Sequence, residues 1–589
     1  MRNSERTRIA IACAIGGCIF TIFSARLVDL QVAKHEEYSR LAAEKNTKRV
    51  EIPARRGMIL DRNGDVLATN LPVRTVVADA SIIKDPEIVA ELAAKHLQMD
   101  VAEIREKILT GGKYLVLKRK VPEHIYGALI SDLQQNKQRG IFGEQDYIRS
   151  YPNGEMLGHV LGFINHERKG VQGIERTMNE HLAGKSGYRF TERDRMGREI
   201  VLYRGTEEMP EHGKNIKLTI DMSLQAALEE ELDAAFKELR PETANAILMD
   251  PKTGEILAMA SRPCFDPNNH GRAQPEQMKN RAIIDMVEPG STFKIVVAAG
   301  ALNEGKVNEK STVFCENGRF AYGGKILRDH HGYGHMTVHD ILVKSSNIGS
   351  AKMAMMMGAE KFHDYVRRFG FGERLGVELP GEIPGLVHPP ARWDNLTITR
   401  MPMGHAIAVT PLQITTGMSV IASGGRLMAP HLVKSIEKTD GEVVYRKSPE
   451  LVREVVPEKT AKFISNALVG VTQPGGTATY ARVNGYLVAG KTGTAQKVSP
   501  KGGYAPGKYV VSFVGYMPAE DPRFVCLVIV DDAKIASNLN YGGLVAAPIF
   551  SRIAEKAAHH MDLTPTLPAV ALQGVGLGGG TPAERQHLD

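Results

Sequence analysis

Three short groups of residues have the types and the order needed for nucleophilic attack on a carbonyl. The first is Ser291 with Lys294, three positions later. Residues three apart lie on one side of a helix, so the lysine amine can take the serine proton once burial or a neighbouring cation lowers its pKa. The apolar segment from Ser291 to Asn303 predicts such a helix, entered through Glu288–Gly290. Ser291 is therefore predicted to stand at a helix N-terminus, where free backbone N–H groups favour negative charge.

Two further Ser-x-x-Lys matches lack this setting. They are Ser81 with Lys84 and Ser435 with Lys438. Neither pair begins an apolar helix, and both segments are predicted to be solvated surface. The spacing alone is a weak signal, so only the pair at Ser291 is retained as catalytic.

The second group is Ser345–Asn347, which reads Ser-Ser-Asn and closes a predicted helical stretch that starts at Thr337. The hydroxyl of Ser345 and the carboxamide of Asn347 could pass a proton and grip a substrate amide. Because such a tripeptide is common by chance, the alternative is an ordinary polar helix end.

The third group is Lys491, Thr492, Gly493 and Thr494 on a predicted strand. A cation, a small residue and hydroxyls along one strand are suited to holding a carboxylate beside the reacting carbonyl. The same Lys-Thr-Gly letters occur at Lys252–Gly254, where they occupy the turn of a predicted hairpin and are followed by Glu. That copy is interpreted as turn chemistry.

A rival pattern covers the same lysine. Gly485–Thr492 matches the nucleotide-binding pattern G-x-x-x-x-G-K-[ST] letter for letter. That pattern requires a loop between a strand and a helix, whereas the four residues between its glycines, Tyr-Leu-Val-Ala, are strand-like. The Gly and Pro residues between Pro500 and Gly507 exclude a helix directly afterwards. No nucleotide site is predicted.

A histidine-rich segment raises the question of a metal. Asp329, His330, His331, His335 and His339 lie within eleven residues. Without a second, well-spaced pair of ligands elsewhere, they are interpreted as a polar loop leading into the next helix. The five cysteines show neither CxxC nor zinc-ribbon spacing, so no disulfide framework is expected. Neither a metal nor a cofactor is predicted.

Periodicity places these groups in a long chain of mixed elements. Residues 30–215 combine strand-like runs with charged helical stretches, and the pattern changes near Gly213. At 589 residues the chain should contain two or more domains. The predicted elements are strands 50–53, 75–78, 114–117 and 216–219, helix 223–239, strands 246–250, 255–260, 486–489, 509–514 and 524–530, and helix 548–561.

The N-terminus carries a membrane signal. Arg2, Arg6 and Arg8 precede the uncharged apolar run Ile9–Ala25. This length is at the short end of a bilayer span, and a cleavable signal peptide has the same charge pattern. An uncleaved anchor with its basic end in the cytoplasm is favoured. The formal charge of +7 comes without a block of Lys and Arg interleaved with aromatics, so nucleic acid is not an expected partner.

In their order, the three groups resemble the signature of penicillin-binding proteins and serine β-lactamases: Ser-x-x-Lys, Ser-x-Asn and Lys-Thr-Gly. The chain departs from the Ser-Asp-Asn form by carrying Ser346, which is similar to the variant of many transpeptidases. The N-terminal half resembles class B enzymes, which are transpeptidases without a glycosyltransferase domain. The segments that carry this second resemblance are Arg56–Gly64, Arg149–Pro152, His159–Gly162 and Gly170–Glu175. The segments similar to the division-specific, FtsI-type branch are Asp194–Arg198 and Tyr541–Phe550.

The resemblance implies an α+β fold. A membrane-anchored, elongated pedestal domain would be followed by a transpeptidase domain of the penicillin-binding and serine β-lactamase type, with an antiparallel sheet and flanking helices. The implied location is the inner membrane, with a single pass and the catalytic domain on the periplasmic side. The implied limits are a cytoplasmic tail at 1–8, an anchor at 9–28, a pedestal at 29–215, a transpeptidase domain at 216–562 and a disordered tail at 563–589.

The resemblance also implies residue roles. Ser291 would attack the penultimate D-Ala carbonyl of a peptidoglycan stem peptide, with Lys294 as the base. Other residues would relay a proton to the leaving D-Ala, orient the substrate and bind its terminal carboxylate. Those further catalytic and substrate-binding residues are Ser345, Asn347, Lys491, Thr492, Gly493 and Thr494. The backbone N–H groups of Ser291 and Thr494 would form the oxyanion hole.

The implied partners follow from the same family. They are stem peptides on lipid-linked nascent glycan, β-lactams as covalent inhibitors, a glycan polymerase of the SEDS family, and other division proteins. An elongation-type enzyme and a penicillin-acylated sensor or scaffold with little turnover remain alternatives. A β-lactamase would need an efficient deacylating base, and the Glu-x-x-Leu-Asn element of class A enzymes is absent after Asn347.

Overall fold

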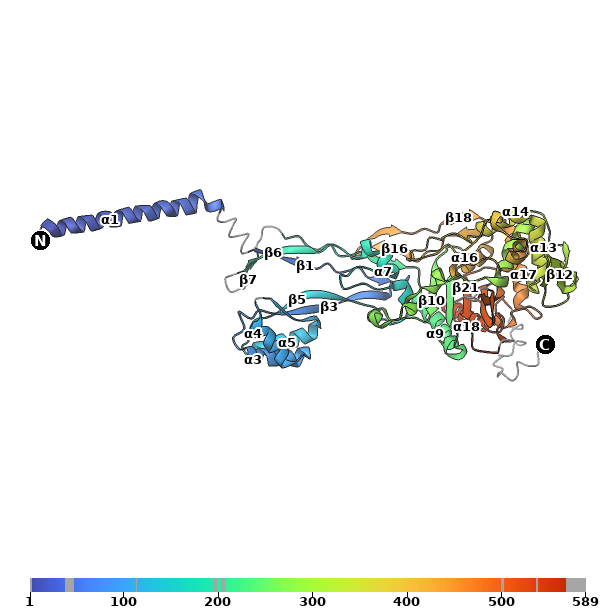
Figure 1. The fold of residues 1–589 in the computed structure, drawn as a ribbon, viewed down its shortest axis with the longest axis horizontal. Helices are drawn as coiled ribbons and strands as arrows, with labels where there is room; N and C mark the ends of the chain where they lie inside the picture. Colours follow the sequence, from blue (N-terminus) through green and yellow to red (C-terminus); the bar gives the residue numbers. More distant parts are fainter. Residues whose placement is uncertain are drawn as a thin grey trace. The chain divides into compact units, whose positions relative to one another are not determined.

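The computed structural model describes residues 3–37, 47–112, 114–193, 199–202, 207–498, 503–536 and 539–567. Their internal contacts divide the chain into two compact units (Figure 1). The first unit consists of Met1–Arg55, Asn70–Ile148 and Gly184–His212, and the second of Arg56–Thr69, Arg149–Ala183 and Gly213–Asp589. The similarity segment at 194–198 and most of the predicted tail, from residue 568, lie outside the described residues.

The chain begins with the helix α1 (Asn3–Val28), which continues as a π-helical turn over Asp29–Ala33. The apolar run predicted from the sequence is thus helical. The stretch Arg6–Ala33 is long and apolar enough to cross a membrane, and none of its most apolar window is buried against the rest of the protein. Its length and composition allow a membrane anchor; its topology stays a prediction.

The rest of the first unit packs helices against strands. Asp85 starts the helix α3 by accepting a hydrogen bond from the backbone N–H of Ile88 at 3.3 Å. Buried aliphatic side chains from strand and helix, such as Val76, Val89 and Leu129, form its hydrophobic core. The elements are β1 (Thr47–Ile52), β3 (Val66–Ala78), α3 (Pro86–Leu97), α4 (Val101–Thr110), β4 (Leu115–Pro122), α5 (Glu123–Gln135), β5 (Ile141–Ser150), β6 (Gly187–Arg193) and β7 (Glu199–Leu202). The start of β3 and the end of β5 belong to the second unit.

The second unit is built on a five-stranded antiparallel sheet with the strand order β10-β9-β21-β20-β19. Every residue of β9 and β10 is buried, and so is all of β21 except its last residue. Both faces of the sheet are therefore covered, which explains the continuous apolar runs in the sequence. The strands are β9 (Thr243–Met249), β10 (Ile256–Arg262), β19 (Ala489–Val498), β20 (Tyr504–Met517) and β21 (Phe524–Asp531).

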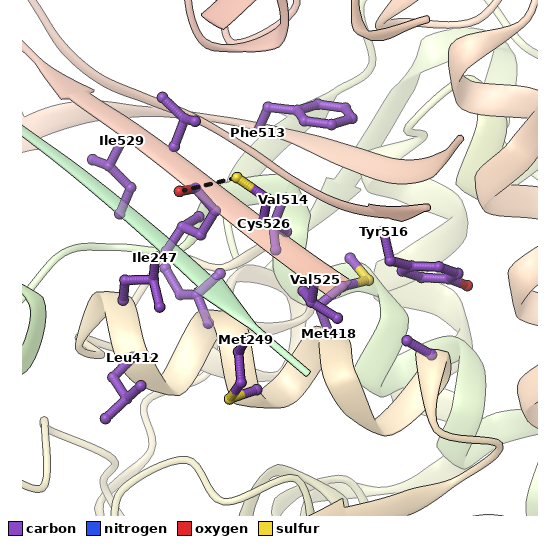
Figure 2. Packing of buried hydrophobic residues seen from close by; sticks show 14 of the residues in the cluster. Ile247, Met249, Leu412, Met418, Phe513, Val514, Tyr516, Val525, Cys526 and Ile529 are labelled. Atoms are coloured by element: carbon purple, nitrogen blue, oxygen red, sulfur yellow. Dashed lines mark hydrogen bonds between the residues drawn. The ribbon is translucent and has the colours of Figure 1, made fainter. Parts of the chain in front are cut away.

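The two faces of this sheet are covered by different helices. Figure 2 shows Ile247, Met249 and Val525 on the face that packs against Leu412 and Met418 of the helix α16 (Pro411–Ala422). On the opposite face, the ring of Phe513 meets that of Phe550 at 4.7 Å between centroids. Phe550 belongs to α18 (Ala546–His560), which also packs against α9 (Met222–Leu239). The sheet is the middle layer of a three-layer α+β domain.

Smaller elements surround this sheet. Those that carry or hold the predicted site are η4 (Gly290–Phe293), α11 (Lys294–Asn303), β12 (Arg319–Tyr322), β13 (Lys325–Arg328), α12 (Val338–Val343) and α13 (Asn347–Met357). The other principal elements are β2 (Ile59–Leu60), α6 (Gly158–Leu161), α7 (Gly173–Thr177), α8 (Asn179–Leu182), β8 (Asn215–Leu218), β11 (Thr312–Phe314), β14 (His335–Thr337), α14 (Ala359–Arg368), β15 (Arg426–Met428), β16 (Val433–Glu437), β17 (Val443–Arg446), β18 (Leu451–Glu454) and α17 (Glu458–Thr472).

Most predicted elements of the second unit are present, but three interpretations were wrong. Residues 486–488 are not a strand, because β19 begins only at Ala489. The Ser-Ser-Asn tripeptide does not close one helix; it links the end of α12 to the start of α13. Ser435 is not solvated surface. It lies on β16 with an exposed fraction of 2%, and its hydroxyl donates to Glu437 Oε1 at 2.7 Å.

A buried ionic cluster explains two of the family-like segments. Glu175 is fully buried and accepts hydrogen bonds from Arg56 Nε and Arg149 Nε, each at 2.6 Å. The hydroxyl of Tyr151 donates to the same carboxylate at 3.3 Å. All of these residues belong to the second unit. These contacts join segments that are far apart in the chain, and losing one partner would leave an uncompensated buried charge, which gives the segments a structural role.

Candidate active site

Ser291 lies on the tight turn that leads into α11. The turn is the 3₁₀ segment η4, and Gly290 has the positive φ of 56° that favours glycine. The backbone of Gly404 packs closely against this turn. A Cβ on Gly404 would lie only 2.1 Å from Gly290 O, so no side chain fits at residue 404. A Cβ on Gly290 would lie 3.2 Å from Thr494 N, so β19 also runs beside this turn. The predicted nucleophile thus follows a turn wedged between two backbone segments.

Lys294 is fully buried beneath this turn, at the start of α11. Its ammonium group donates hydrogen bonds to Ser345 O, to Ser345 Oγ at 3.1 Å and to Asn347 Oδ1 at 2.8 Å. Burial, reinforced by the positive charge of Lys491, holds the pKa of Lys294 well below its usual range, while Asp329 partly opposes that shift. This shift favours the neutral amine, which is the form that can accept a proton from a serine hydroxyl.

Ser345 stands between two buried lysines. Lys491 Nζ, also fully buried, donates to Ser345 Oγ at 3.0 Å, so both amines contact the same hydroxyl. Burial lowers the pKa of Lys491 to about 7. Ser345 has a φ of 60°, which is uncommon for a residue other than glycine. Lys294, Ser345 and Lys491 form a continuous path along which a proton can move.

The rest of the Lys-Thr-Gly-Thr group lies along β19. Thr492 Oγ1 is 3.3 Å from Thr477 Oγ1, and Thr494 Oγ1 accepts a hydrogen bond from the backbone N–H of Gly542 at 3.2 Å. Gly493 has no room for a side chain, since a Cβ there would lie 2.9 Å from Pro289 O. The strand therefore presses directly against the turn that carries the predicted nucleophile.

The rival patterns have a different setting. Gly490–Thr492 lies within β19 and is followed by the rest of that strand, so this segment is not a phosphate-binding loop between a strand and a helix. Lys252–Gly254 forms the turn between β9 and β10, as predicted. Ser81 is an exposed turn residue. Within the described ranges, no group of three or more His, Cys, Asp or Glu side chains could hold a metal ion.

Two residues with polar contacts at or near this site were not predicted from the sequence. Asp329 was interpreted as part of a polar loop, yet its carboxylate contacts Ser346 and the backbone of the Ser-Ser-Asn segment. Glu288 was noted only as a helix-start residue, yet its Oε2 lies 2.8 Å from His405 Nδ1 and accepts a hydrogen bond from Tyr504 OH at 3.1 Å. Both contacts join residues far apart in the chain, and no local pattern signals them.

The comparisons with known proteins agree with this site. The family model described as the penicillin-binding protein transpeptidase domain matches residues 244–555, and the penicillin-binding protein dimerisation domain matches residues 51–218. The first of these matches covers more than half of the chain and places it in one class of protein, the penicillin-binding transpeptidases. The chain belongs to the class B penicillin-binding proteins, which are peptidoglycan D,D-transpeptidases.

The relatives cover nearly the whole chain. Stage V sporulation protein D of Bacillus subtilis is 33% identical over 566 residues, covering 95% of this chain and 86% of its own. Peptidoglycan D,D-transpeptidase FtsI of Escherichia coli is 32% identical over 589 residues, covering 97% and 96%. The crystal structure of penicillin-binding protein 3 from Mycobacterium tuberculosis complexed with aztreonam has a TM-score of 0.69 and 27% identity, covering 88% and 99%. The predicted family and fold class are confirmed.

Proposed function

We propose that this transpeptidase cross-links stem peptides during septal cell-wall synthesis, with Ser291 as its acylated nucleophile. The observation that carries the residue assignment is the shared contact of two buried lysines with Ser345 Oγ, together with the close approach of Lys491's strand to the turn of Ser291. The septal role is supported by the similarity to FtsI over almost the full length of both chains.

In the proposed acylation, Ser291 Oγ attacks the carbonyl carbon of the penultimate D-Ala, and its proton passes to Lys294 Nζ. The backbone N–H groups of Ser291 and Thr494 stabilise the oxyanion of the tetrahedral intermediate. The C–N bond then breaks, and the terminal D-Ala leaves after its nitrogen has taken a proton through Ser345 from Lys491 or Lys294. The product of this half-reaction is an ester on Ser291.

In the second half-reaction, the amine of another stem peptide attacks this ester. The amine loses a proton to the lysine pair, the C–O bond to Ser291 breaks, and Ser291 Oγ recovers its proton. Asn347 holds the substrate amide, and Thr492, Gly493 and Thr494 hold the terminal carboxylate of the donor. A β-lactam would follow the first half-reaction only, because its leaving group stays attached.

The proposed organisation follows the limits predicted from the sequence. Residues 9–28 would anchor the chain in the inner membrane with the tail 1–8 in the cytoplasm, and residues 29–215 would form the pedestal. The transpeptidase domain would cover 216–562; residues 563–567, placed in the tail by the sequence, hydrogen-bond to Gly485 and Tyr486 of this domain. The length and apolar character of α1 support the anchor. The pedestal would bind a SEDS-family glycan polymerase and other division proteins, because it carries no nucleophile–base pair of its own.

Labelling with a fluorescent penicillin tests the residue assignment. Ser291→Ala should abolish the covalent label, while Ser81→Ala, on the exposed Ser-x-x-Lys match, should leave it unchanged. Full labelling of the Ser291→Ala protein would refute the assignment of Ser291 as the nucleophile.

The septal role is tested by depleting the protein in its source cell. Filaments with blocked septa would support the septal role, and rounded cells would favour an elongation enzyme.

A further inference from the structure

The Ser-Ser-Asn segment is held by a carboxylate from another part of the chain. Asp329 follows the strand β13, and its Oδ2 accepts a hydrogen bond from Ser346 Oγ at 2.6 Å. Its Oδ1 accepts from the backbone N–H groups of Asn347 at 2.5 Å and Ile348 at 3.1 Å. These two N–H groups open the helix α13, where a negative charge is favoured.

The same segment also fixes the carboxamide of Asn347. The backbone oxygen of Arg328 accepts a hydrogen bond from Asn347 Nδ2 at 3.0 Å. Asn347 Oδ1 is thereby left to accept from Lys294 Nζ at 2.8 Å. Arg328 and Asp329 together hold the side chain and the backbone of Asn347, so its orientation is set from outside the tripeptide.

Ser345 needs this support because its own backbone is strained. A φ of 60° is unfavourable for a residue other than glycine, and such strain persists only where the surroundings over-determine the backbone. On one side, Ser345 is held by the two lysine amines. On the other, the next two residues are bound by Asp329. Without that carboxylate, the backbone N–H groups of Asn347 and Ile348 and the hydroxyl of Ser346 would lose the acceptor that holds the segment on this side.

We propose that Asp329 is a positioning residue of the transpeptidase: its carboxylate holds the Ser-Ser-Asn segment so that Ser345 Oγ stays between Lys294 and Lys491. This inference rests on the proposed function of that site. The Ser-Asp-Asn form of the motif carries a carboxylate at the middle position. Here Ser346 occupies that position, and a carboxylate reaches it from residue 329 instead.

The first test compares Asp329→Asn with Asp221→Asn in the full-length protein. Asp221 is another aspartate that binds backbone N–H groups at a helix start, accepting from Ser223 N at 3.1 Å and Leu224 N at 3.2 Å at the start of α9. Both variants should unfold at a lower temperature. Only Asp329→Asn should slow the second-order acylation by fluorescent penicillin, by about 100-fold, because small misplacements of catalytic groups have effects of that size.

The pH profile adds a readout that a merely structural role would not move. Lys294 faces Lys491 from β19 and Asp329 from the loop after β13, with His330 next to Asp329. Removing the Asp329 charge removes the influence that raises the pKa of Lys294, so the acid limb of acylation should move to lower pH. An Asp329→Asn protein that acylates at the wild-type rate, or more slowly but with an unmoved acid limb, would overturn the proposal.

A second pair of variants covers the case in which Asp329→Asn does not fold. Asp329→Ser should acylate slowly, and adding Ser346→Asp should restore at least 10-fold of the lost rate by placing a carboxylate back on the tripeptide. A folded double variant no faster than Asp329→Ser would refute the proposal. Ser291→Ala separates this inference from the proposed function. If the Ser291→Ala protein is labelled, the proposed function is refuted. If it is not labelled but Asp329→Asn is acylated at the wild-type rate, only this inference is refuted.

Discussion

Two of the places where the second unit buries charge have opposite consequences. Around Glu175, two guanidinium groups surround one carboxylate, so opposite charges offset one another. Around Ser345, two lysine amines share one neutral hydroxyl, and the Asp329 carboxylate only partly opposes the effect of burial on Lys294. The first arrangement joins segments far apart in the chain, and removing its carboxylate would leave two uncompensated buried cations; the second lowers lysine pKa values and makes proton transfer possible. Burial serves a structural role in one cluster and reactivity in the other.

The largest expected effect is the loss of reactivity on removing the Lys294 amine. Lys294→Met should slow penicillin acylation by roughly 10³-fold, since general bases contribute factors of this order. Its melting temperature should stay within a few degrees of wild type, because two effects on stability oppose each other. The variant no longer buries a costly amine, but Ser345 and Asn347 lose the donor of their hydrogen bonds. Acylation rates and thermal unfolding measured on the same preparation check both statements. A large loss of stability would mean that Lys294 is mainly structural.

At the cluster around Glu175 we expect a loss of stability without a loss of reactivity. Glu175→Gln leaves two buried guanidinium groups without their carboxylate and should lower the free energy of unfolding by about 3–5 kcal/mol. The folded protein should still be acylated at the wild-type rate, since the cluster does not touch the lysine pair. Urea unfolding provides the measurement. The control is Glu167→Gln, an exposed surface partner of Lys169, for which no change is expected. Equal stability of the two variants would contradict the comparison.

A pH series should sharpen the difference further. Burial lowers the pKa of Lys491 to about 7 in the folded protein, below its ordinary value of 10.5. Between these values the unfolded chain binds more protons, so stability rises with pH by up to about 1.4 kcal/mol per unit. This contribution is present above the unfolded pKa and is lost as pH falls through about 7. Subtracting the profile of Lys491→Met from that of wild type isolates it, and a flat difference from pH 7 to 10 would contradict the burial argument.

The smallest effects concern the two unused Ser-x-x-Lys matches. Ser435→Ala should lower the free energy of unfolding by about 1 kcal/mol, because a buried hydroxyl loses its bond to Glu437. Ser81→Ala, on an exposed turn, should change stability less. Neither substitution should alter penicillin labelling. If the folded Ser435→Ala protein were labelled less than wild type, this expectation would be wrong. Such a result would mean that β16 affects the active site, although no hydrogen bond among the described residues links them.

The sequence indicated which residues the structure brings together better than it indicated how they contact one another. Short-range spacing and helix-start context were enough to select Ser291 and Lys294 over the other matches. The order of the three groups gave the family, which the comparisons confirmed. The same letters could not reveal that Lys294 and Lys491 meet at one hydroxyl, because this contact depends on how the turn η4 packs against β19. The catalytic roles themselves remain predictions.

The misses share one physical cause. The role of Asp329 depends on contacts 17–19 residues away, and that of Glu175 on contacts up to 119 residues away. The wrong surface interpretation of Ser435 has the same origin, since a polar residue on a short strand is buried or exposed according to what packs on it. Local patterns predict helix starts and strand runs; they do not predict which distant carboxylate or guanidinium completes a polar cluster.

The backbone contacts around Ser291 have a consequence for how such an enzyme can evolve under antibiotic pressure. Substitution at Gly404 or Gly493 would push a Cβ into the turn that carries Ser291, and Gly290 has both a positive φ and little free space. Stem peptide and β-lactam would meet the same serine on the same turn, so a shift that excludes the drug also displaces the natural donor. Variants that tolerate the drug should therefore accumulate at side chains lining the site, and the three glycines should stay invariant.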